Sequence, residues 1–463
     1  MPVSAVARRR TRRLLGGVLA LVTGLAAPAT LAPPAAAAPA GAATSARPLA
    51  GAFTTAAARY DVPRDLLVAL GYAETRLDMH AGAPSASGGY GLMHLVHNPA
   101  VRTLDEAARL TGLGLPALRT EPAANVLGAA AVLRSYADQA GLDDAAHKDV
   151  DRWYGPVARY GGASDLAVAR LYADTVYDLL RTGFPAVGGA GVTARPVAPR
   201  RGALERAAAP GDIGTLSTDY GPAAWAPAST SNYTVANRPT SHPIRYVVIH
   251  VTQGSYAGSI SWFQNPAAQV SAHYTFRSSD GAVTQSVREK DIAWHAGNWT
   301  YNTQSIGIEH EGYVDDPAWF TDAMYRSSAA LTRTLTARYG IPRDRSHIIG
   351  HVEVPGATHT DPGPNWNWTY YMQLVQGITG IGSGTVHTSS SVNVRSGPGT
   401  GYAVVGSLTD GASVSIYCQA VGTTVTGTYG TSNIWNRIGT NRYVSDAFVL
   451  TGYDGYIPGV PRC

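Results

Sequence analysis

The stretch RYVVIHVT, residues 245–252, is a run of β-branched and aromatic residues interrupted by a histidine. An apolar run of this length is typical of a buried strand. The stretch 322–340 has apolar residues three and four apart and ends in Gly340, which predicts a helix with a glycine C-cap. Strands and helices together indicate an α/β block over residues 218–380, a mixed sheet covered by helices. Further short β-rich runs in this block are AHYTFRS (272–278), AVTQSV (282–287) and SIGIEHEG (305–312).

The chain has 463 residues, which is too long for one ordinary core at roughly 100 to 200 residues per domain. Residues 45–184 carry apolar residues at helical spacing and predict an all-α domain. Residues 185–217 are rich in Ala, Pro and Gly without a period, which predicts a linker. Residues 383–463 contain short strands separated by Gly, Pro, Ser and Asp, which predicts a small all-β barrel or sandwich. The expected fold class is therefore multidomain, with all-α, α/β and all-β parts in that order.

Residues 1–40 differ in character from the rest of the chain. Five arginines precede an apolar run from Leu14 to about Ala27, and an Ala-rich end follows. This pattern predicts a cleaved secretory signal, and TRRLL leaves a twin-arginine export route open. A retained membrane anchor is the alternative, but glycines interrupt the run and it is shorter than the roughly 20 residues that span a bilayer. We therefore expect an exported protein.

Composition limits the class of partner. Hydrophobic residues make up 45% of the chain and charged residues 15%, which is typical of a globular protein with well-filled cores. The formal net charge is +4, and removal of the five arginines in residues 1–40 would lower it to −1. A near-neutral mature chain gives no support for nucleic acid or an acidic membrane as a partner.

The two cysteines, Cys418 and Cys463, lie close to the C-terminal end of the sequence. An exported chain usually oxidises such a pair, so we expect a disulfide. Two isolated thiols are the alternative. Metal binding through sulfur is not expected, because neither cysteine lies near the histidines.

Eight of the thirteen histidines lie between His242 and His359, so ionisable side chains are concentrated in the α/β block. His250 ends the first apolar strand run, His351 follows the apolar run HIIG, and Asp361 comes ten residues later. Two imidazoles and one carboxylate with an open fourth position are the pattern of a catalytic zinc site. The alternative is that each histidine caps a strand or satisfies a hydrogen bond in the core, and spacing alone leaves both open.

Six motifs in a fixed order connect these residues to a known family. They are RYVVIHVTQGSY, VSAHYTFRSSDG, AWHAGN, SIGIEHEG, IIGHVEV and HTDPGP. Together they resemble the zinc-dependent N-acetylmuramoyl-L-alanine amidases of the phage-lysozyme and peptidoglycan-recognition type. The resemblance implies that His250, His351 and Asp361 hold Zn²⁺ and that Glu309 is the catalytic glutamate.

The resemblance also implies roles for neighbouring residues. His359 stands where many members have lysine, and as a hydrogen-bond donor it would stabilise the tetrahedral oxyanion. Ala272 stands where some phage members have a tyrosine, which disfavours a tyrosine-assisted mechanism. The resemblance then assigns the proton transfer to Glu309, which would take a proton from zinc-activated water and deliver it to the departing amine. His295 is expected to line the substrate groove, with a structural role as the alternative. His273 is expected to pack in the core.

The N-terminal block carries a second resemblance. LLVALGYAETRLD followed by SASGGYGLMHLV is similar to the lysozyme-like domain of lytic transglycosylases, and Glu74 stands where that family has its acid. An apolar helix around this carboxyl would keep it protonated for donation to a glycosidic oxygen. Thr75 and His94 depart from the usual Ser and Gln, and WYGPV at residues 153–157 only echoes the family's Tyr-Asn-Ala-Gly motif. Glycan cleavage, a glycan-binding or inactive domain, and a resemblance in fold alone therefore all stay open.

The C-terminal block, residues 383–463, resembles bacterial SH3-like domains that bind cell walls. The resemblance rests on VNVRSGPGTGYAVVGSL and WNRI. Such a module raises the effective concentration of an enzyme on an insoluble polymer. Its aromatic residues Tyr402, Trp435 and Tyr443 are more typical of a core than of a binding groove.

These observations favour an exported peptidoglycan hydrolase, secreted or held at the cell wall. It would use zinc-activated water to cut the amide between the N-acetylmuramic acid lactyl group and L-alanine of the stem peptide. A non-hydrolytic peptidoglycan recognition protein is one alternative, and a bifunctional enzyme that also cuts glycan strands is another. The complete set of three implied zinc ligands favours hydrolysis. Peptidoglycan is the expected partner, with neither nucleic acid nor a membrane after signal removal.

Overall fold

The structure is a computed structural model that describes residues 48–207 and 216–463. The predicted secretory signal, residues 1–40, lies outside the described residues. By their contacts, the described residues belong to one unit. Among them, no helix combines the length and the apolar character that a membrane span requires.

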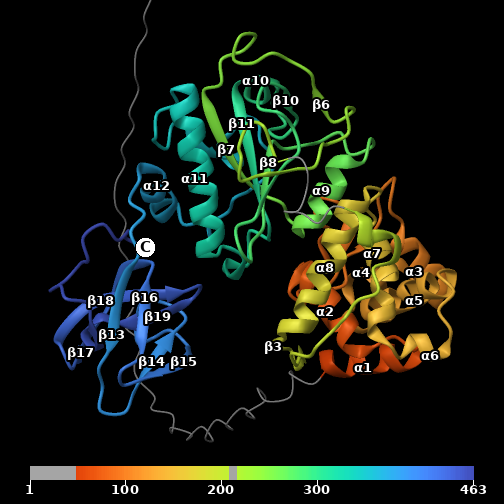
Figure 1. Ribbon diagram of the computed structural model, residues 1–463, viewed down its shortest axis with the longest axis horizontal. Coiled ribbons are helices and arrows are strands. Elements are labelled where there is room, and N and C mark those ends of the chain that lie inside the picture. The colour runs from red at the N-terminus through yellow and green to blue at the C-terminus, as the bar shows by residue number, and fades with distance from the viewer. Residues whose placement is uncertain (1–47, 208–215) are drawn as a thin grey trace, which may run out of the picture. The chain divides into compact units, whose positions relative to one another are not determined.

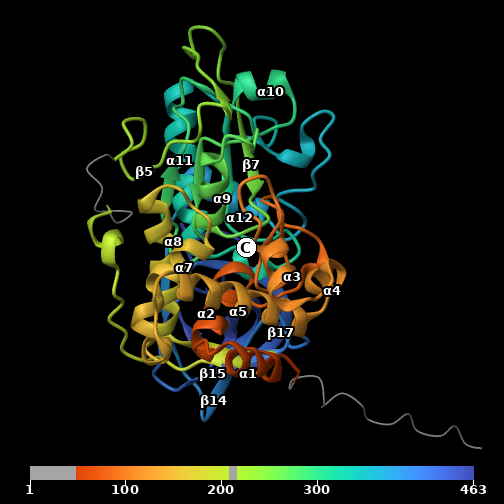
Figure 2. The same ribbon diagram turned by 90° about the vertical axis from the view of Figure 1, so that its right-hand side faces the viewer.

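A helical region forms the N-terminal part of the described chain, as the sequence predicts. Its central helix α5 runs through the group of helices in both views (Figures 1 and 2). Helix α2 is buried along most of its length and contributes Leu66, Leu67 and Leu70 to the core. The helices are α1 (Pro48–Tyr60), α2 (Arg64–Thr75), α3 (Thr103–Thr111), α4 (Leu115–Thr120), α5 (Pro122–Gln139), α6 (Asp144–His147), α7 (Tyr154–Tyr160) and α8 (Leu166–Thr182), with a short hairpin of β1 (Gly89–Tyr90) and β2 (Leu95–Val96).

The stretch 185–217, which the sequence predicts to be a linker, contains regular structure. Strands β3 (Phe184–Val187) and β4 (Ala190–Val192) form an antiparallel hairpin, and a 3₁₀ helix follows at Gly202–Arg206. Ala190 and Val192 are buried in the core of the helical region. Small apolar residues fill this part of the core without the periodicity on which sequence interpretation depends. At least the first part of the stretch therefore belongs to the helical region.

The central part is a mixed α/β sheet, as predicted. Its strands lie in the order β12, β7, β11, β8, β9, β5, and the first four are parallel to one another. The strands are β5 (Ala224–Trp225), β7 (Tyr246–Val251), β8 (Tyr274–Phe276), β9 (Val283–Gln285), β11 (Ser305–His310) and β12 (Ile348–Gly350), with β6 (Tyr233–Thr234) and β10 (Ile292–Ala293) forming a separate pair. The helices are α9 (Tyr256–Gln264), α10 (Trp299–Gln304), α11 (Asp322–Tyr339) and α12 (Trp368–Gln376).

Helix α11 covers one face of this sheet, beside strands β7 and β11 (Figure 1). Met324, Leu331 and Leu335 are fully buried and share a core with residues of both strands. The helix ends at Gly340, whose φ of 66° lies in the left-handed region, which glycine adopts without steric cost. The predicted helix and its C-cap are therefore confirmed.

The C-terminal part is antiparallel β structure in two sheets, in the orders β16, β13, β20 and β15, β14, β19, β18, β17. Trp435 is buried, as expected of a core residue, whereas Tyr402 is 51% exposed. Cys418 and Cys463 form a disulfide. The strands are β13 (Gly382–Val386), β14 (Ser391–Arg395), β15 (Val404–Thr409), β16 (Ser413–Ile416), β17 (Cys418–Gly427), β18 (Gly430–Gly439), β19 (Arg442–Ser445) and β20 (Val449–Leu450).

The disulfide should stabilise the C-terminal β region locally. It closes a loop with a sequence separation of 45, and the chain-entropy description assigns such a loop about 4 kcal/mol. We expect Cys463→Ser to lower amide hydrogen-exchange protection in β13 to β20 by up to that amount and to leave α2 and α5 unchanged, because neither cysteine packs against the core of the helical region. Equal loss of protection in α2 and α5 would contradict a local effect.

Candidate active site

The parallel strands bring the predicted site residues to one edge of the sheet. In the register of β7 and β11, His250 lies directly opposite Glu309. In the register of β12 and β7, Gly350 pairs with Ile249, so His351 follows at the level of His250. The carboxyl ends of parallel strands meet at the same edge of a sheet, where ligand sites of open α/β folds usually lie. The fold therefore gathers three residues that lie far apart in the sequence.

Asp361 completes the cluster from the loop that follows His351. Its Oδ1 lies 3.1 Å from His351 Nδ1, and its Oδ2 lies 3.2 Å from His250 Nδ1. All three residues are buried, and one potential ligand atom from each lies within 4.8 Å of the other two. The predicted ligand set is therefore assembled around a single point.

The protonation states of this cluster suit a cation. Burial lowers the pKa of His250 to about 4, and nearby Asp361 offsets this only in part. Near neutral pH the cluster therefore offers a neutral imidazole and an ionised carboxylate, which are the forms that bind Zn²⁺.

A chain of hydrogen bonds orients His250. Ser305 Oγ donates its hydrogen to the carbonyl oxygen of Tyr301, so it accepts a hydrogen bond from His295 Nε2, at 3.0 Å. Burial lowers the pKa of His295 well below its ordinary value, so its Nδ1 is an acceptor for His250 Nε2, at 2.9 Å. His250 Nδ1 is left with a lone pair that faces Asp361 Oδ2. Two acceptors at this distance repel each other unless a cation lies between them, and hence the residues fit a metal ion.

Glu309 lines the same cavity as the three ligand candidates. Its Oε2 atom is buried and has no hydrogen-bond partner among the described residues. Burial, and then the negative charge of Asp361, raises the pKa of Glu309 well above its ordinary value of 4.5. The carboxyl group can therefore hold a proton at a pH where an exposed glutamate has lost it.

Three further histidines of the α/β part differ in their surroundings. His359 is exposed, stacks on His351 with ring centroids 4.9 Å apart and lines the cavity. His295 lines the cavity as well, and it also supports His250. His273 is fully buried, and its ring contacts Arg238 and the amide of Gly307, which agrees with the predicted packing role.

The cavity also has a wall that the sequence does not reveal. Ala86 and Ser87 from the helical region line it together with Trp262 and Trp294 of the α/β part. Its volume is about 250 Å³. Ala86 and Ser87 are separated from the nearest ligand by more than a hundred positions, and neither residue type carries a chemical signal. Only the packing of the two parts against each other places them here.

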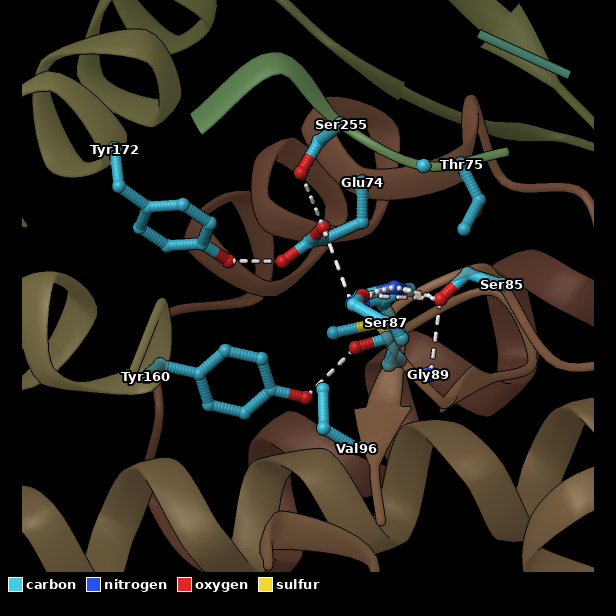
Figure 3. Close-up of polar contacts among 12 residues, drawn as sticks. Glu74, Thr75, Ser85, Ser87, Gly89, Val96, Tyr160, Tyr172 and Ser255 are labelled. Carbon is cyan, nitrogen blue, oxygen red and sulfur yellow. Dashed lines mark hydrogen bonds and ion pairs between the residues drawn. The ribbon is translucent and has the colours of Figure 1, made fainter. Parts of the chain in front are cut away.

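Glu74, the other predicted acid, lies in a different cavity. Figure 3 shows Tyr172 and Ser255 approaching its carboxyl group from different sides. The hydroxyl of Tyr172 donates to Oε1, and that of Ser255 donates to Oε2 at 2.9 Å. His94 Nδ1 lies 3.5 Å from Oε2. Glu74 is therefore a contact point between the helical region and the start of α9.

Comparison with known proteins assigns the central part to a family. A family model described as N-acetylmuramoyl-L-alanine amidase matches residues 240–364. N-acetylmuramoyl-L-alanine amidase A of Achromobacter lyticus is 44% identical over 178 residues, which cover 35% of this chain and 97% of that protein. This chain belongs to the N-acetylmuramoyl-L-alanine amidase family.

Two further comparisons give the extent of the similarity. The 1,6-anhydro-N-acetylmuramyl-L-alanine amidase AmpD of Salmonella typhimurium is 42% identical over 113 residues, 23% of this amidase and 58% of that protein. A crystal structure of an AmpD derivative is 29% identical, with a TM-score of 0.29, and the match covers 35% of this chain and 99% of that chain. The amidase hydrolyses the N-acetylmuramoyl-L-alanine amide of peptidoglycan, as the sequence predicts.

Gly307→Ala should weaken metal binding without touching a ligand. A Cβ at this position would collide with the ring of His295 and so displace the support of His250. Loss of such a supporting contact typically costs about 10- to 100-fold in metal affinity. We expect a decrease of that size in Zn²⁺ affinity, measured by chelator competition. Gly221→Ala is the matched control, because its Cβ would meet nothing within 4 Å. Equal affinities in the two variants would contradict the supporting role.

Glu309→Gln should stabilise the metal-free amidase near neutral pH. The raised pKa of Glu309 means that the unfolded chain loses this proton first as the pH rises above about 4.5. The folded state then binds more protons than the unfolded state, so the free energy of unfolding falls with increasing pH. Glutamine does not titrate, so we expect the advantage of the variant to be absent near pH 4 and to grow toward pH 7 in urea unfolding experiments. A pH-independent difference would contradict the shifted pKa.

Proposed function

We propose that the amidase is zinc-dependent and that His250, His351 and Asp361 are the ligands. The observation that carries the proposal is the convergence of two imidazole nitrogens and one carboxylate, with the lone pair of His250 Nδ1 facing Asp361 Oδ2. This donor set matches the three protein ligands of catalytic zinc sites. When bound, zinc would act as a Lewis acid that activates water and polarises the scissile carbonyl.

Glu309 is the proton carrier in this proposal. A cation bound at the neighbouring ligand cluster would favour the ionised form of Glu309. Its unpartnered Oε2 and its position opposite His250 then suit a group that takes a proton from the attacking water. The raised pKa of Glu309 favours retention of that proton until the leaving amine of L-alanine accepts it. Without this delivery the amine would have to depart as an anion, which is a far poorer leaving group.

His359 and His295 have different tasks in the same reaction. His359 is exposed beside His351, where its ring N–H can donate to the oxygen that becomes negative as water adds to the carbonyl. His295 holds His250 in one tautomer and one orientation. His295 also lines the cavity, so its predicted contact with substrate is compatible with its support of His250.

We further propose that the chain is exported and acts on the cell wall. The leader-like residues 1–40 and the disulfide between Cys418 and Cys463 support export. In this proposal residues 45–184 are a lysozyme-like domain without glycan cleavage, and residues 383–463 are an SH3-like wall-binding domain. The helical domain would extend beyond residue 184, because the hairpin of β3 and β4 packs into its core.

Glycan cleavage by Glu74 is not part of this proposal. A general acid needs an O–H group aimed at the leaving oxygen. Both carboxyl oxygens of Glu74 already accept hydrogen bonds, from Tyr172 and from Ser255. Proton donation would require one of these contacts to break first.

Digestion of purified peptidoglycan tests the proposal. We expect the untreated protein to release free stem peptides, and chelator treatment to stop the release until Zn²⁺ is restored. Glu309→Gln should reduce the rate by at least about 10²-fold, the usual contribution of a general base, while it retains bound zinc. Full activity of a folded Glu309→Gln variant would refute its role, and shortened glycan strands would show that Glu74 acts as an acid after all.

A further inference from the structure

A second cluster of ionisable side chains lies in the helical region. Asp61, Asp144 and His147 each offer one potential ligand atom, and these atoms lie within 4.8 Å of one another. Asp61 directly follows α1, and Asp144 and His147 are the first and last residues of α6 (Figure 1). In the part of the chain that the structure describes, none of the three lines the cavity of the zinc ligand candidates or the cavity at Glu74. Amide hydrolysis therefore does not account for this cluster.

His147 is the buried member of the cluster. It is 2% exposed, and neither of its ring nitrogens has a hydrogen-bond partner among the described residues. Its Nδ1 lies 3.7 Å from Asp61 Oδ2 and 3.9 Å from Asp144 Oδ1. Both separations exceed hydrogen-bond distance, so a proton on the imidazole would not join it to either carboxylate. A buried polar group in this condition opposes folding unless another group or an ion pairs with it.

The spacing of the cluster suits a metal ion between the three ligand atoms. Metal–ligand bonds of about 2.0 to 2.2 Å put two ligands of a tetrahedral ion about 3.4 Å apart. The separations of 3.7 and 3.9 Å are slightly longer. The side chain of Asp144 is 97% exposed, and an exposed side chain changes rotamer rapidly. Its carboxylate can therefore swing aside to admit an ion and then close on it, which makes the buried imidazole accessible.

The imidazole of His147 is held in one place by its surroundings. Trp153 Nε1 donates a hydrogen bond to the carbonyl oxygen of His147, at 2.9 Å, and the two rings lie with their centroids 5.7 Å apart. On the other side of the imidazole, Nε2 faces Asp138 Oδ1 at 3.6 Å. A histidine that binds a metal usually directs its second nitrogen toward a carboxylate, which fixes the orientation of the ring. Asp138 is therefore placed to orient His147.

Helix α6 presents its two ligand candidates on one side. Asp143 caps the helix, because its Oδ1 accepts a hydrogen bond from the amide of Ala146 at 2.8 Å. Asp144 and His147 follow three positions apart, a spacing that brings side chains together on a helix. The cap is thus made by Asp143, and the carboxylate of Asp144 lies beside the imidazole instead.

The charge around the cluster favours a cation. Asp61, Asp138 and Asp144 bring three carboxylates to His147. Among the described ion pairs of these carboxylates, Arg134 supplies the one guanidinium. It donates to Asp138 at 2.7 Å and lies 3.9 Å from Asp61. Three negative charges and one positive charge leave a formal charge of −2, which a divalent cation would neutralise.

We propose that Asp61, Asp144 and His147 form a second metal site, which binds a divalent transition-metal ion of the zinc type. Ca²⁺ and Mg²⁺ take oxygen ligands, whereas one imidazole and two carboxylates match the ligands of Zn²⁺. Water would complete the coordination, because both carboxylates are exposed. The ion would join the end of α1 to α6 and so stabilise the helical region, whereas the ion at the amidase centre serves catalysis.

The number of zinc ions per chain tests this site separately from the amidase centre. The purified protein is equilibrated with Zn²⁺, freed of unbound ion by gel filtration, and analysed for zinc by mass spectrometry. We expect two ions in the wild-type protein, one in His147→Gln, one in Asp361→Asn, and none when both substitutions are combined. His147→Gln should keep the amidase activity of the wild-type protein.

His97→Gln is the matched control for this count. His97 also lies beside a carboxylate of the helical region, with its Nδ1 2.8 Å from Asp105 Oδ2. It belongs to no three-residue ligand cluster among the described residues. We therefore expect His97→Gln to keep both ions.

Each count has a definite meaning. An unchanged count in His147→Gln, whether one ion or two, would overturn the second site and leave the amidase centre intact. A single ion in the wild-type protein that is lost in His147→Gln would support the second site and contradict the proposed amidase centre. Absence of zinc from the wild-type protein would overturn both.

Hydrogen exchange with a milder variant separates metal binding from a folding defect. Asp144→Asn changes a side chain that is 97% exposed, so it removes little packing. In the Asp361→Asn protein, Zn²⁺ should slow amide exchange in α6 and at Val62, whose amide bonds the end of α1, and Ca²⁺ should not. Addition of Asp144→Asn should raise the Zn²⁺ concentration that gives half of this protection about tenfold or more, since loss of a group that only supports a ligand already has an effect of that size. Equal protection with and without Asp144→Asn, or protection by Ca²⁺, would overturn the proposal.

Discussion

The parallel register of β12, β7 and β11 is the constraint on which the site depends. It places Glu309 opposite His250 and leaves His351 at the same level. In-register residues on neighbouring strands point to the same face, so the three side chains converge without a specialised loop. The strands are buried in a continuous core, and a close-packed core resists displacement. The preorganisation that a metal ligand set needs therefore comes from the sheet itself, and the loop after His351 has only to return Asp361.

Sequence patterns predict the parts of this site that depend on neighbouring residues in the chain. The apolar run that ends in His250 and the run before His351 predict both strands, and the periodicity of residues 322–340 predicts α11 with its C-cap. The hydrogen bond between His250 and His295 joins residues from separate segments, and no spacing rule connects them. Ala86 and Ser87 are equally invisible, because small side chains become cavity walls only through tertiary packing. The hairpin that begins at Phe184 gives no sequence signal for the same reason, since alanine and glycine leave no period.

The site keeps several groups in states that oppose folding. His250 Nδ1 faces a carboxylate, Glu309 has a buried oxygen without a partner, and burial holds the pKa of His295 well below its ordinary value. Each unsatisfied buried group costs about 1 to 3 kcal/mol, a large fraction of the net stability of a domain. A bound cation would relieve the first of these conflicts and would weaken the effect of Asp361 on Glu309. The folded state is therefore expected to gain stability from the ion that it needs for catalysis.

Helix α9 connects this chemistry to the helical region. The contacts differ from those of a domain on a flexible tether, which would share no core with its neighbour. Here the hydroxyl of Ser255 donates a hydrogen bond to Glu74, and Tyr256 is buried in the core of the helical region. Two further contacts join the same parts away from α9. Arg76 stacks on Trp319, with the guanidinium carbon 3.9 Å from the ring centroid. His80 stacks on Tyr313, with the ring centroids 3.6 Å apart. A helix fixed at its start by a carboxyl of one part and capped by a carboxyl of the other moves only when both parts move. The start of α9 is thus tied to the helical region through Glu74 and to the amidase sheet through Glu311, which follows β11.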